Sequence, residues 1–301
     1  MNEKILFVIL TCNRQWYCRN CYFSMRKCVD MDRADILICD NNTVEEGFDE
    51  FLHEEAKKDN VEVKKFDDRN RNELYRAMNY AIQYAQKNKY KIINFVQDDF
   101  QYIYRRDNHL DEVIDILNNR KDIVQVNCNM GWKRKAKGLG KIEDFKSLGT
   151  RYGILKDKRS CDNGFTRVDI YDKIGLYPGE AVSWGNGPNR YKDKLNGEIW
   201  FGRECKERKL YRCLSYMPNI GMMMDCSYVR GNRRYGYYSS PPNDFYLKML
   251  DDNQIKQIRK NHDAGKFSFV EDFCIPDGWE PRTYNKHTPI RNPQKVDWTK
   301  D

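Results

Sequence analysis

Two adjacent carboxylates, Asp98 and Asp99, stand at the end of an apolar run, and no other feature of the sequence points as strongly to chemistry. Residues 92–96 are apolar except for Asn94, and Gln97 separates them from the acidic pair. Like charges repel and burial of charge is costly, so two carboxylates at the tip of a buried strand need a compensating partner. Mg²⁺ or Mn²⁺ takes one or two protein carboxylates and completes its shell with substrate phosphates and water. The pair therefore predicts a divalent metal site that carries a phosphate-bearing ligand.

Polar residues also follow two earlier apolar runs. Residues 4–10 and 34–39 are segments of strand length that are apolar except for Lys4 and Asp35, as expected for strands buried on both faces of a parallel sheet. The first is followed by the polar segment 11–14 and the second by 40–43, while 97–99 closes the run described above. Ligands bind beyond the carboxyl ends of the strands in such sheets, so three polar strand ends predict one shared binding site.

Strand-like and helix-like segments alternate four times before the acidic pair, which predicts a parallel α/β sheet with right-handed crossovers. The second half of the chain is less regular, the part beyond Asp225 is rich in Arg, Tyr, Gly and Pro, and the tail from residue 276 looks extended. The expected helices are 15–28, 47–58, 72–88, 109–119, 197–209 and 251–262, and the expected strands are 4–10, 34–39, 61–66, 91–96 and 123–128.

Composition favours a globular, cytoplasmic chain. Of the 301 residues 40% are hydrophobic and 33% charged, and no apolar run approaches the roughly 20 residues that a membrane span needs. The 11 cysteines have no framework spacing, which favours free thiols in a reducing compartment over disulfides or zinc. The net charge of +8 suits an anionic ligand or an anionic membrane surface, and it is too diffuse to predict nucleic-acid binding.

The order of these motifs resembles the GT-A glycosyltransferases, particularly the family-two type that transfers a sugar from a nucleoside diphosphate. The resemblance covers roughly residues 4–226. It implies that Asp40 accepts hydrogen bonds from the nucleotide base and that Thr11 lines the same pocket. The residues that match the family's turns after the first two strands are Thr11, Asn13, Arg14, Asp40, Asn41 and Thr43.

The next family segment departs from the pattern. Where the family has Asn-x-Gly-x-x-x-Ala-x-Asn-x-Gly, this chain lacks both glycines and the first Asn. Arg71 or Arg76 can still reach the nucleotide, since a guanidinium suits phosphates and planar bases. A solvent-facing helix charge is an equally open interpretation of both arginines.

The family's metal motif is a carboxylate, any residue, and a second carboxylate, and here Gln97 replaces the first. The resemblance implies that Asp99 binds the metal ion, that Asp98 contacts the ribose or the donor sugar, and that Asp225 supplies a further metal ligand. The open alternative is that Asp98 or Asp99 caps the segment that follows.

Glycosyl transfer also needs a carboxylate that removes the proton of the acceptor hydroxyl. The resemblance places this base at the start of a late helix and implies Glu198, with Asp162 as the reserve candidate. The second acidic position of the motif is Ile199, which is a departure. An acid in a first helical turn is also favoured by the helix dipole alone, so a structural role for Glu198 stays open.

We expect a GT-A α/β fold, with a mostly parallel central sheet flanked by helices, over residues 1–226. Its nucleotide-binding half is 1–104 and its acceptor half 105–226, and an irregular C-terminal extension, 227–301, packs on the same domain. The expected function is Mn²⁺- or Mg²⁺-dependent transfer from a UDP- or GDP-sugar to a hydroxyl of a glycan, glycolipid or protein-linked sugar, with inversion. We expect no nucleic-acid partner, and peripheral membrane attachment stays open.

Three alternatives compete with this function. A nucleotidyltransferase also joins an α/β sheet to paired carboxylates, but it would need a glycine-rich loop after the first strand to hold a triphosphate. The segment 11–14 has no glycine. A basic nucleic-acid-binding protein would bind polyanions with a steep salt dependence and without Asp99. A catalytically silent relative is suggested by the missing glycines and by Gln97 and Ile199.

Overall fold

The computed structural model describes residues 3–67, 73–98, 100–127, 141–155, 164–178, 197–217, 221–223, 249–266 and 268. Four candidate site residues lie outside these ranges, namely Arg71, Asp99, Asp162 and Asp225. The predicted extended tail also lies outside them. Glu198 is described in its backbone but not in its side chain.

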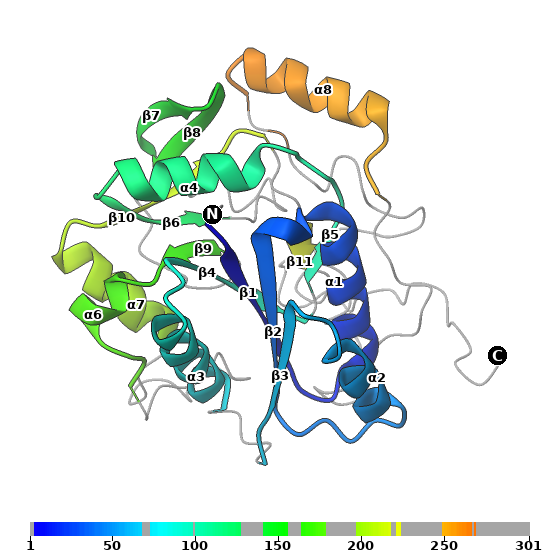
Figure 1. Ribbon diagram of the computed structural model, residues 1–301. Helices are drawn as coiled ribbons and strands as arrows, with labels where there is room; N and C mark the ends of the chain where they lie inside the picture. The colour runs from blue at the N-terminus through cyan, green and yellow to red at the C-terminus, as the bar shows by residue number, and fades with distance from the viewer. Residues whose placement is uncertain are drawn as a thin grey trace, which may run out of the picture.

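A nine-stranded sheet forms the centre of the molecule, in the order β3-β2-β1-β4-β9-β6-β10-β8-β7 (Figure 1). Strands β3, β2, β1 and β4 are parallel neighbours, and β9 and β8 run opposite to the other seven strands. The mostly parallel sheet predicted from the sequence is therefore confirmed. The strands are β1 (Ile5–Thr11), β2 (Ala34–Asp40), β3 (Val61–Lys65), β4 (Ile92–Gln97), β6 (Ile123–Asn127), β7 (Lys141–Ser147), β8 (Thr150–Leu155), β9 (Gly164–Arg167) and β10 (Tyr211–Ser215).

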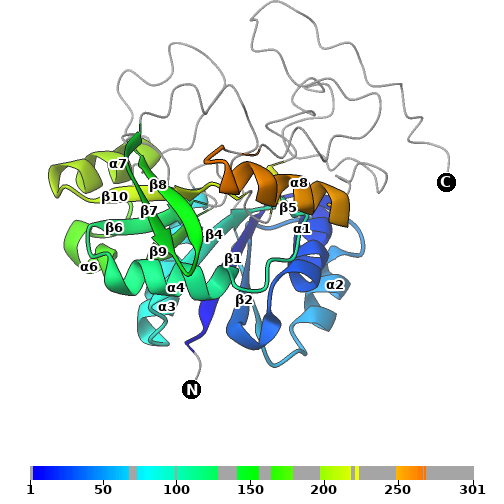
Figure 2. The same ribbon diagram turned by 90° about the horizontal axis from the view of Figure 1, so that it is seen from above.

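Helices cover both faces of this sheet (Figures 1 and 2). On one face pack α1 (Gln15–Cys28), α2 (Phe48–Glu55) and α4 (His109–Asn119). On the other pack α3 (Glu73–Lys87), α6 (Ile170–Ile174) and α7 (Gly197–Glu207). This arrangement explains why β1 is apolar without alternation. Its residues Ile5, Phe7 and Ile9 enter one core cluster, and Leu6, Val8 and Leu10 enter the other.

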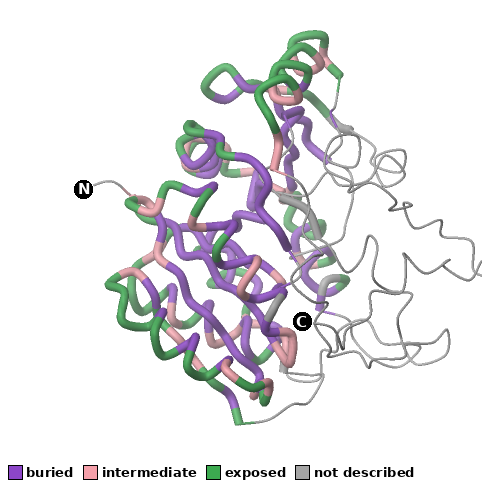
Figure 3. Tube along the Cα trace, turned by 90° about the vertical axis from the view of Figure 1, so that its right-hand side faces the viewer, coloured by how far each residue is buried: buried purple, intermediate pink, exposed green. Residues whose placement is uncertain are grey.

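The helices bury the stripes that their sequences predict. In α3, Met78, Ala81, Ile82 and Ala85 are fully buried against the sheet, at helical spacing. Figure 3 shows the same contrast along the chain, with buried strands in the centre and helices that are buried on one side only. The first strand–helix–strand units therefore fold as local pattern predicts, and they hold the segments after β1, β2 and β4 in fixed positions.

A second sheet of two short strands lies next to the main one. Here β5 (Phe100–Tyr102) pairs antiparallel with β11 (Gly221–Met223), with Phe100 opposite Met223. The sequence predicted neither strand. A 3-10 turn, Met31–Arg33, precedes β2.

The last described helix, α8 (Asp252–Asp263), begins with a capping box between Asp251 and Gln254. It packs beside the β7–β8 hairpin (Figure 1). The backbone N–H of Arg151 donates to Nε2 of His262 at 2.9 Å, and Ile258 is fully buried. This part of the C-terminal extension thus contacts the sheet directly.

Several predicted boundaries were wrong at helix ends. The helix expected over 47–58 ends at Glu55, and the one expected over 197–209 ends at Glu207. Both are followed by short turns that continue the helical hydrogen bonding for a few residues before the next strand. No helix in the described part of the chain is long and apolar enough to cross a membrane.

Candidate functional site

The ends of β2, β1 and β4 lie side by side at the carboxyl edge of the sheet. Thr11 is in register with Asp40, and Leu10 with Gln97. Beyond these positions the backbone continues the pattern, because Asn41 N–H donates to the Thr11 carbonyl at 2.9 Å and Asp98 N–H to the Leu10 carbonyl at 3.0 Å. The three polar strand ends predicted from the sequence therefore meet in the structure.

Asp98 connects two of these ends through its side chain. Its carboxylate accepts a hydrogen bond from the Thr11 hydroxyl at 3.0 Å and pairs with the Arg14 guanidinium at 3.1 Å. The Asp98 side chain is only 4% exposed and that of Arg14 only 13%. The guanidinium also lies over the ring of Tyr17, with its carbon 4.6 Å from the ring centroid. Asp98 thus has its counter-charge within the protein, and Arg14 is held between a carboxylate and an aromatic face.

The segments after β1 and β2 exchange hydrogen bonds. Asn13 N–H donates to the Thr43 hydroxyl at 2.8 Å, and Val44 N–H donates to Oδ1 of Asn13 at 2.9 Å. Asn13 and Asn42 both have positive φ, 49° and 57°, a region that asparagine tolerates better than most residues. The two segments therefore form one interlocked surface at the edge of the sheet.

Asp40 lies inside this surface and is fully buried. Its carboxylate accepts hydrogen bonds from the backbone N–H of Thr43, at 3.1 Å, and from the Thr43 hydroxyl. Burial raises the pKa of Asp40, and the bonds from Thr43 partly offset that rise. The carboxylate thus shapes the turn after β2, at the position where the resemblance expects contact with the base.

Asn41, next to Asp40, contributes an acceptor that points to a ligand. Its Oδ1 is buried and has no hydrogen-bond partner among the described residues. A buried acceptor without a donor costs free energy, so such groups call for an explanation. An N–H group of a nucleotide base is a donor of the required kind.

The N-terminus of α1 is already occupied by protein. The backbone N–H of Gln15 donates to the carboxylate of Glu45, and the Gln15 side chain donates to the Glu46 carbonyl at 3.1 Å. Burial raises the pKa of Glu45, and the bond from Gln15 together with the charge of Arg14 counteracts this. The helix end that binds phosphate in many α/β proteins is therefore capped here by an internal anion.

Cys18 lies beneath the site and is fully buried. Burial is the main cause that raises the pKa of its thiol, and the nearby charges of Asp98 and Asp40 raise it further. The residue is held as a neutral thiol, so it is a packing group and not a nucleophile.

The described residues do not by themselves form a metal centre. No group of three or more His, Cys, Asp or Glu side chains in the described ranges is placed to hold an ion. Asp98, the described member of the acidic pair, is engaged with Thr11 and Arg14. The two expected ligands, Asp99 and Asp225, lie outside the described residues.

The remaining described candidates lie on α3 and α7. Arg76 is exposed on α3, with its guanidinium carbon 5.4 Å from the Phe66 ring centroid. Glu198 belongs to the first turn of α7, directly after Gly197. A Cβ atom at Gly197 would lie 2.3 Å from the ring of Tyr75, so the start of α7 touches the first turn of α3. Since α3 follows β3, this contact places the start of α7 towards the carboxyl edge of the sheet.

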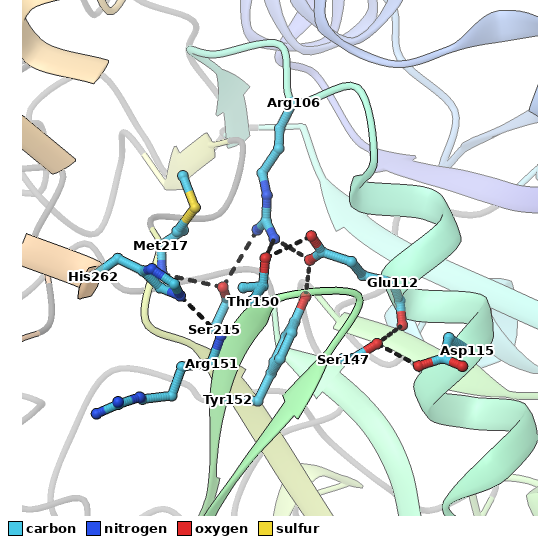
Figure 4. A network of polar contacts seen from close by, with 10 residues as sticks. All are labelled: Arg106, Glu112, Asp115, Ser147, Thr150, Arg151, Tyr152, Ser215, Met217 and His262. Atoms are coloured by element: carbon cyan, nitrogen blue, oxygen red, sulfur yellow. Dashed lines mark hydrogen bonds and ion pairs between the residues drawn. The ribbon is translucent and has the colours of Figure 1, made fainter. Parts of the chain in front are cut away.

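A buried polar network that the sequence did not predict lies on the α4 side of the sheet (Figure 4). Arg106 pairs with Glu112 and donates to the hydroxyls of Thr150, at 2.9 Å, and Ser215, at 3.3 Å. Glu112 also accepts from the hydroxyls of Thr150, at 2.7 Å, and Tyr152. The network ties the segment between β5 and α4 to β8 and β10.

His109 lies next to this network at the start of α4. It is 2% exposed, and neither ring nitrogen has a hydrogen-bond partner among the described residues. Its ring packs edge-on against Phe165, with centroids 5.3 Å apart. Burial, and then the charge of Arg106, hold the pKa of His109 well below its usual value, so the ring is neutral.

Comparison with solved structures identifies the fold. GalNAc-T7 with UDP, GalNAc and Mn²⁺ superposes with a TM-score of 0.50 at 14% sequence identity, over 73% of this chain and 42% of that one. The mannosyltransferase PcManGT from Pyrobaculum calidifontis, in complex with GDP-Man and Mn²⁺, gives 0.48 at 10% identity, over 72% and 58%. TarS 1–349 from S. aureus gives 0.47 at 13% identity, over 70% and 57%.

This chain therefore spans about half the length of those proteins. No family model and no curated sequence matches it. The likeness to GalNAc-T7 concerns the fold, and with the sheet described above it confirms the GT-A α/β fold expected from the sequence.

Proposed function

We propose that this protein is a glycosyltransferase that transfers a sugar from a UDP- or GDP-sugar to a carbohydrate acceptor. The observation that carries the proposal is the meeting of three polar strand ends at one edge of a GT-A sheet, where Asp98 joins Thr11 and Arg14. A ligand at this edge would meet a buried acceptor, Asn41 Oδ1, and a fixed cation, Arg14. Those two features suit the base and the phosphates of a nucleotide.

The donor pocket in this proposal comprises Thr11, Asn13, Arg14, Asp40, Asn41 and Asp98, with Arg71 and Arg76 as further phosphate or base contacts. The base lies over the interlocked segments after β1 and β2. Asp40 supports it through the turn it forms with Thr43, and Asn41 offers the free oxygen. The diphosphate lies towards β4, near Arg14.

A divalent ion, Mn²⁺ or Mg²⁺, is part of the proposal, with Asp99 and Asp225 as its protein ligands. Bound there, the ion would neutralise charge on the diphosphate leaving group. The support comes from the pairing of β5 with β11. Asp99 precedes Phe100 and Asp225 is two residues beyond Met223, and Phe100 and Met223 are paired partners in the β5–β11 sheet.

Glu198 is the proposed general base, with Asp162 in reserve, and the proposed outcome is inversion. The support for Glu198 is the contact of Gly197 with Tyr75, which positions the first turn of α7 next to α3. A carboxylate in a first helical turn tends to stay ionised at neutral pH, as a base requires.

The described site speaks against a nucleotidyltransferase. That enzyme class would need the loop and helix start after β1 to cradle a triphosphate. Here the Gln15 N–H is already bound by Glu45, and a second anion would be repelled. A non-catalytic nucleic-acid-binding protein would instead bind polyanions with the same affinity whether or not Asp99 is present.

Calorimetric titration of UDP and GDP, with and without Mn²⁺, tests the proposal on the wild type and on Asp99→Ala. We expect one nucleotide to bind the wild type in the presence of Mn²⁺, and the substitution to weaken it at least about tenfold, or about 1.4 kcal/mol. Asp107→Ala is the matched control, because Asp107 has an 83% exposed side chain and pairs only with Arg105 among the described contacts. If neither nucleotide binds the folded wild type with Mn²⁺ present, the donor site proposed here does not exist.

A further inference from the structure

We infer that Asp98 is a positioning residue that acts through Arg14, and that Arg14 is the cation that this chain presents to the diphosphate of the donor. The inference rests on the proposed function and deepens it. It assigns Asp98 a role different from the contact with ribose or sugar that the sequence resemblance implies.

The burial of Asp98 carries the first step. Its side chain is 4% exposed, and its two carboxylate oxygens are bound from different sides, Oδ2 by the Thr11 hydroxyl and Oδ1 by Arg14. Its backbone N–H is bonded to the Leu10 carbonyl. A ribose hydroxyl would have to displace one of these buried partners to reach the carboxylate. Breaking a buried ion pair by removing one partner is strongly unfavourable, so this carboxylate serves its neighbours.

The two contacts of Arg14 carry the second step. Oδ1 of Asp98 lies 3.1 Å from Nη1 of the guanidinium, and the guanidinium carbon lies 4.6 Å from the centroid of the Tyr17 ring. A guanidinium held at one nitrogen and packed over one ring has fewer orientations open to it, and the planar fork of a guanidinium suits phosphate oxygens. The Arg14 side chain is already ordered before the ligand arrives, so less conformational entropy is lost on binding.

Arg14 lies at the point of the sheet edge where the diphosphate is expected. It follows β1 at the carboxyl edge, between the turn of Asp40 and the tip of β4. The start of α1, where phosphate would otherwise bind, is closed by Glu45. Because the negative charge of Glu45 already lies at the helix end, the arginine is the group that favours a diphosphate at this point of the edge.

A double-mutant cycle read with two ligands tests this inference. UDP and uridine, or GDP and guanosine if the wild type prefers guanine, are titrated into the wild type, Asp98→Asn, Arg14→Gln and the double variant. Asn keeps an oxygen for the Thr11 hydroxyl but loses the charge that holds Arg14. We expect each single substitution to weaken the diphosphate about 10- to 100-fold. The double variant should be no weaker than either single one, and nucleoside affinity should stay unchanged throughout.

Arg14→Lys is the second variant. It keeps the positive charge, but a lysine ammonium lacks the planar fork of the guanidinium that pairs with Asp98 while lying over Tyr17. We therefore expect it to lose most of the diphosphate affinity that Arg14→Gln loses. Arg33→Gln and Asp111→Asn form the matched control pair. Their ion pair is 2.6 Å long with an Arg side chain 16% exposed, and it lies at the start of β2, at the opposite edge of the sheet. These two variants should bind both ligands as the wild type does. Denaturant unfolding of every variant confirms that it is folded.

Three results would overturn the inference. The first is a loss of nucleoside affinity in Asp98→Asn as large as the loss for the diphosphate, which would mean direct contact with the ribose. The second is an additive loss in the double variant, and the third is tighter diphosphate binding by Asp98→Asn. Failure of the wild type to bind either nucleotide would instead contradict the proposed function, so the two failures are distinguishable.

Discussion

At the scale of single residues, Thr43 holds the turn after β2 in three ways. Its N–H and hydroxyl both donate to Asp40, and its hydroxyl also accepts from the N–H of Asn13. Valine has nearly the shape of threonine but lacks the hydroxyl. Thr43→Val should therefore lower the free energy of unfolding by about 1–3 kcal/mol, because a buried carboxylate loses a donor.

Serine is the matched control at this position, since it keeps the hydroxyl and removes only a methyl group. Thr43→Ser should lose clearly less stability than Thr43→Val in the same denaturant titration. Equal losses in the two variants would show that the methyl group contributes as much as the hydroxyl, and a Thr43→Val variant as stable as the wild type would show that the hydroxyl bonds do not stabilise the fold.

His109 gives the protein a pH dependence that can be assigned to one side chain. The buried ring has a lowered pKa, so the folded state binds its proton less readily than the unfolded state. The contribution of His109 to the free energy of unfolding is therefore fully present above the pKa of the unfolded state, about 6.5. It falls as the pH drops below that value, by at most about 1.4 kcal/mol per pH unit. Arg106, the charge that faces the ring, stays protonated throughout this range.

His109→Phe should flatten this part of the curve of unfolding free energy against pH. Phenylalanine cannot take up a proton and can still pack against Phe165. Denaturant titrations between about pH 5 and pH 7.5 would measure the slope. His53→Asn is the control, because His53 is exposed on α2, and its slope should match that of the wild type. An unchanged slope in His109→Phe would assign the acid sensitivity to other groups.

At the scale of elements, the packing of α7 on α3 depends on the absence of a side chain at Gly197. A Cβ there would lie 2.3 Å from the Tyr75 ring, and Tyr75 is itself stacked on Tyr177 with centroids 5.0 Å apart. Gly197→Ala must therefore shift either the first turn of α7 or the ring of Tyr75. We expect a loss of about 1–3 kcal/mol in unfolding free energy, typical of overpacking, although alanine is the better helix former.

Arg203→Ala tests whether this loss is specific to the contact. Arg203 is exposed on the same helix, so its truncation should change stability by less than about 0.5 kcal/mol. A Gly197→Ala variant as stable as the wild type would show that α7 does not need this close approach to α3.

The elements with a strong local pattern were predictable from sequence. The limits of α1 and α4 agree with the prediction. β1 and β4 differ from it by one residue at each end, and β2 by one residue at its carboxyl end. Each is either an apolar run or an amphipathic stretch of helical period, and each is bounded by polar or turn-forming residues. The meeting of the polar segments at the ends of these strands followed from the same signals, because the carboxyl ends of neighbouring parallel strands lie at one edge of the sheet.

The missed elements lack such a pattern. Strands β5, β9 and β11 have only three or four residues each, and β7 is mostly polar in sequence. Their pairing depends on distant partners, as when β9 inserts between β4 and β6. The Arg106 network was missed for the same reason. Its partners Thr150, Ser215 and Glu112 are 44, 109 and 6 residues away in sequence, and no local spacing joins them.

At the scale of the whole molecule, that network joins the segment between β5 and α4 to the nine-stranded sheet. Arg106 follows β5, whereas Thr150 and Ser215 belong to β8 and β10. Arg106→Met should lower the free energy of unfolding by about 3–5 kcal/mol, because Glu112 would remain as a buried charge without its counter-ion. Denaturant unfolding measures this directly.

Arg120→Ala is the comparison for this variant. Arg120 also forms ion pairs, with Asp122 and Glu143, but these carboxylates are partly exposed. We therefore expect its truncation to lower the free energy of unfolding by about 1 kcal/mol or less. If Arg106→Met costs no more than Arg120→Ala, the buried network does not hold the segment between β5 and α4 on the sheet.

The interlocked segments after β1 and β2 also govern how this edge of the molecule moves. Asn13 and Thr43 cannot separate without breaking the bond to Val44 as well, so local opening of one segment requires opening of the other. Their amide hydrogens should then exchange with deuterium together, and slowly, as one cooperative unit. A ligand that arrives at such a surface finds it already formed, and its rate of association is set by diffusion and orientation and not by the ordering of a loop.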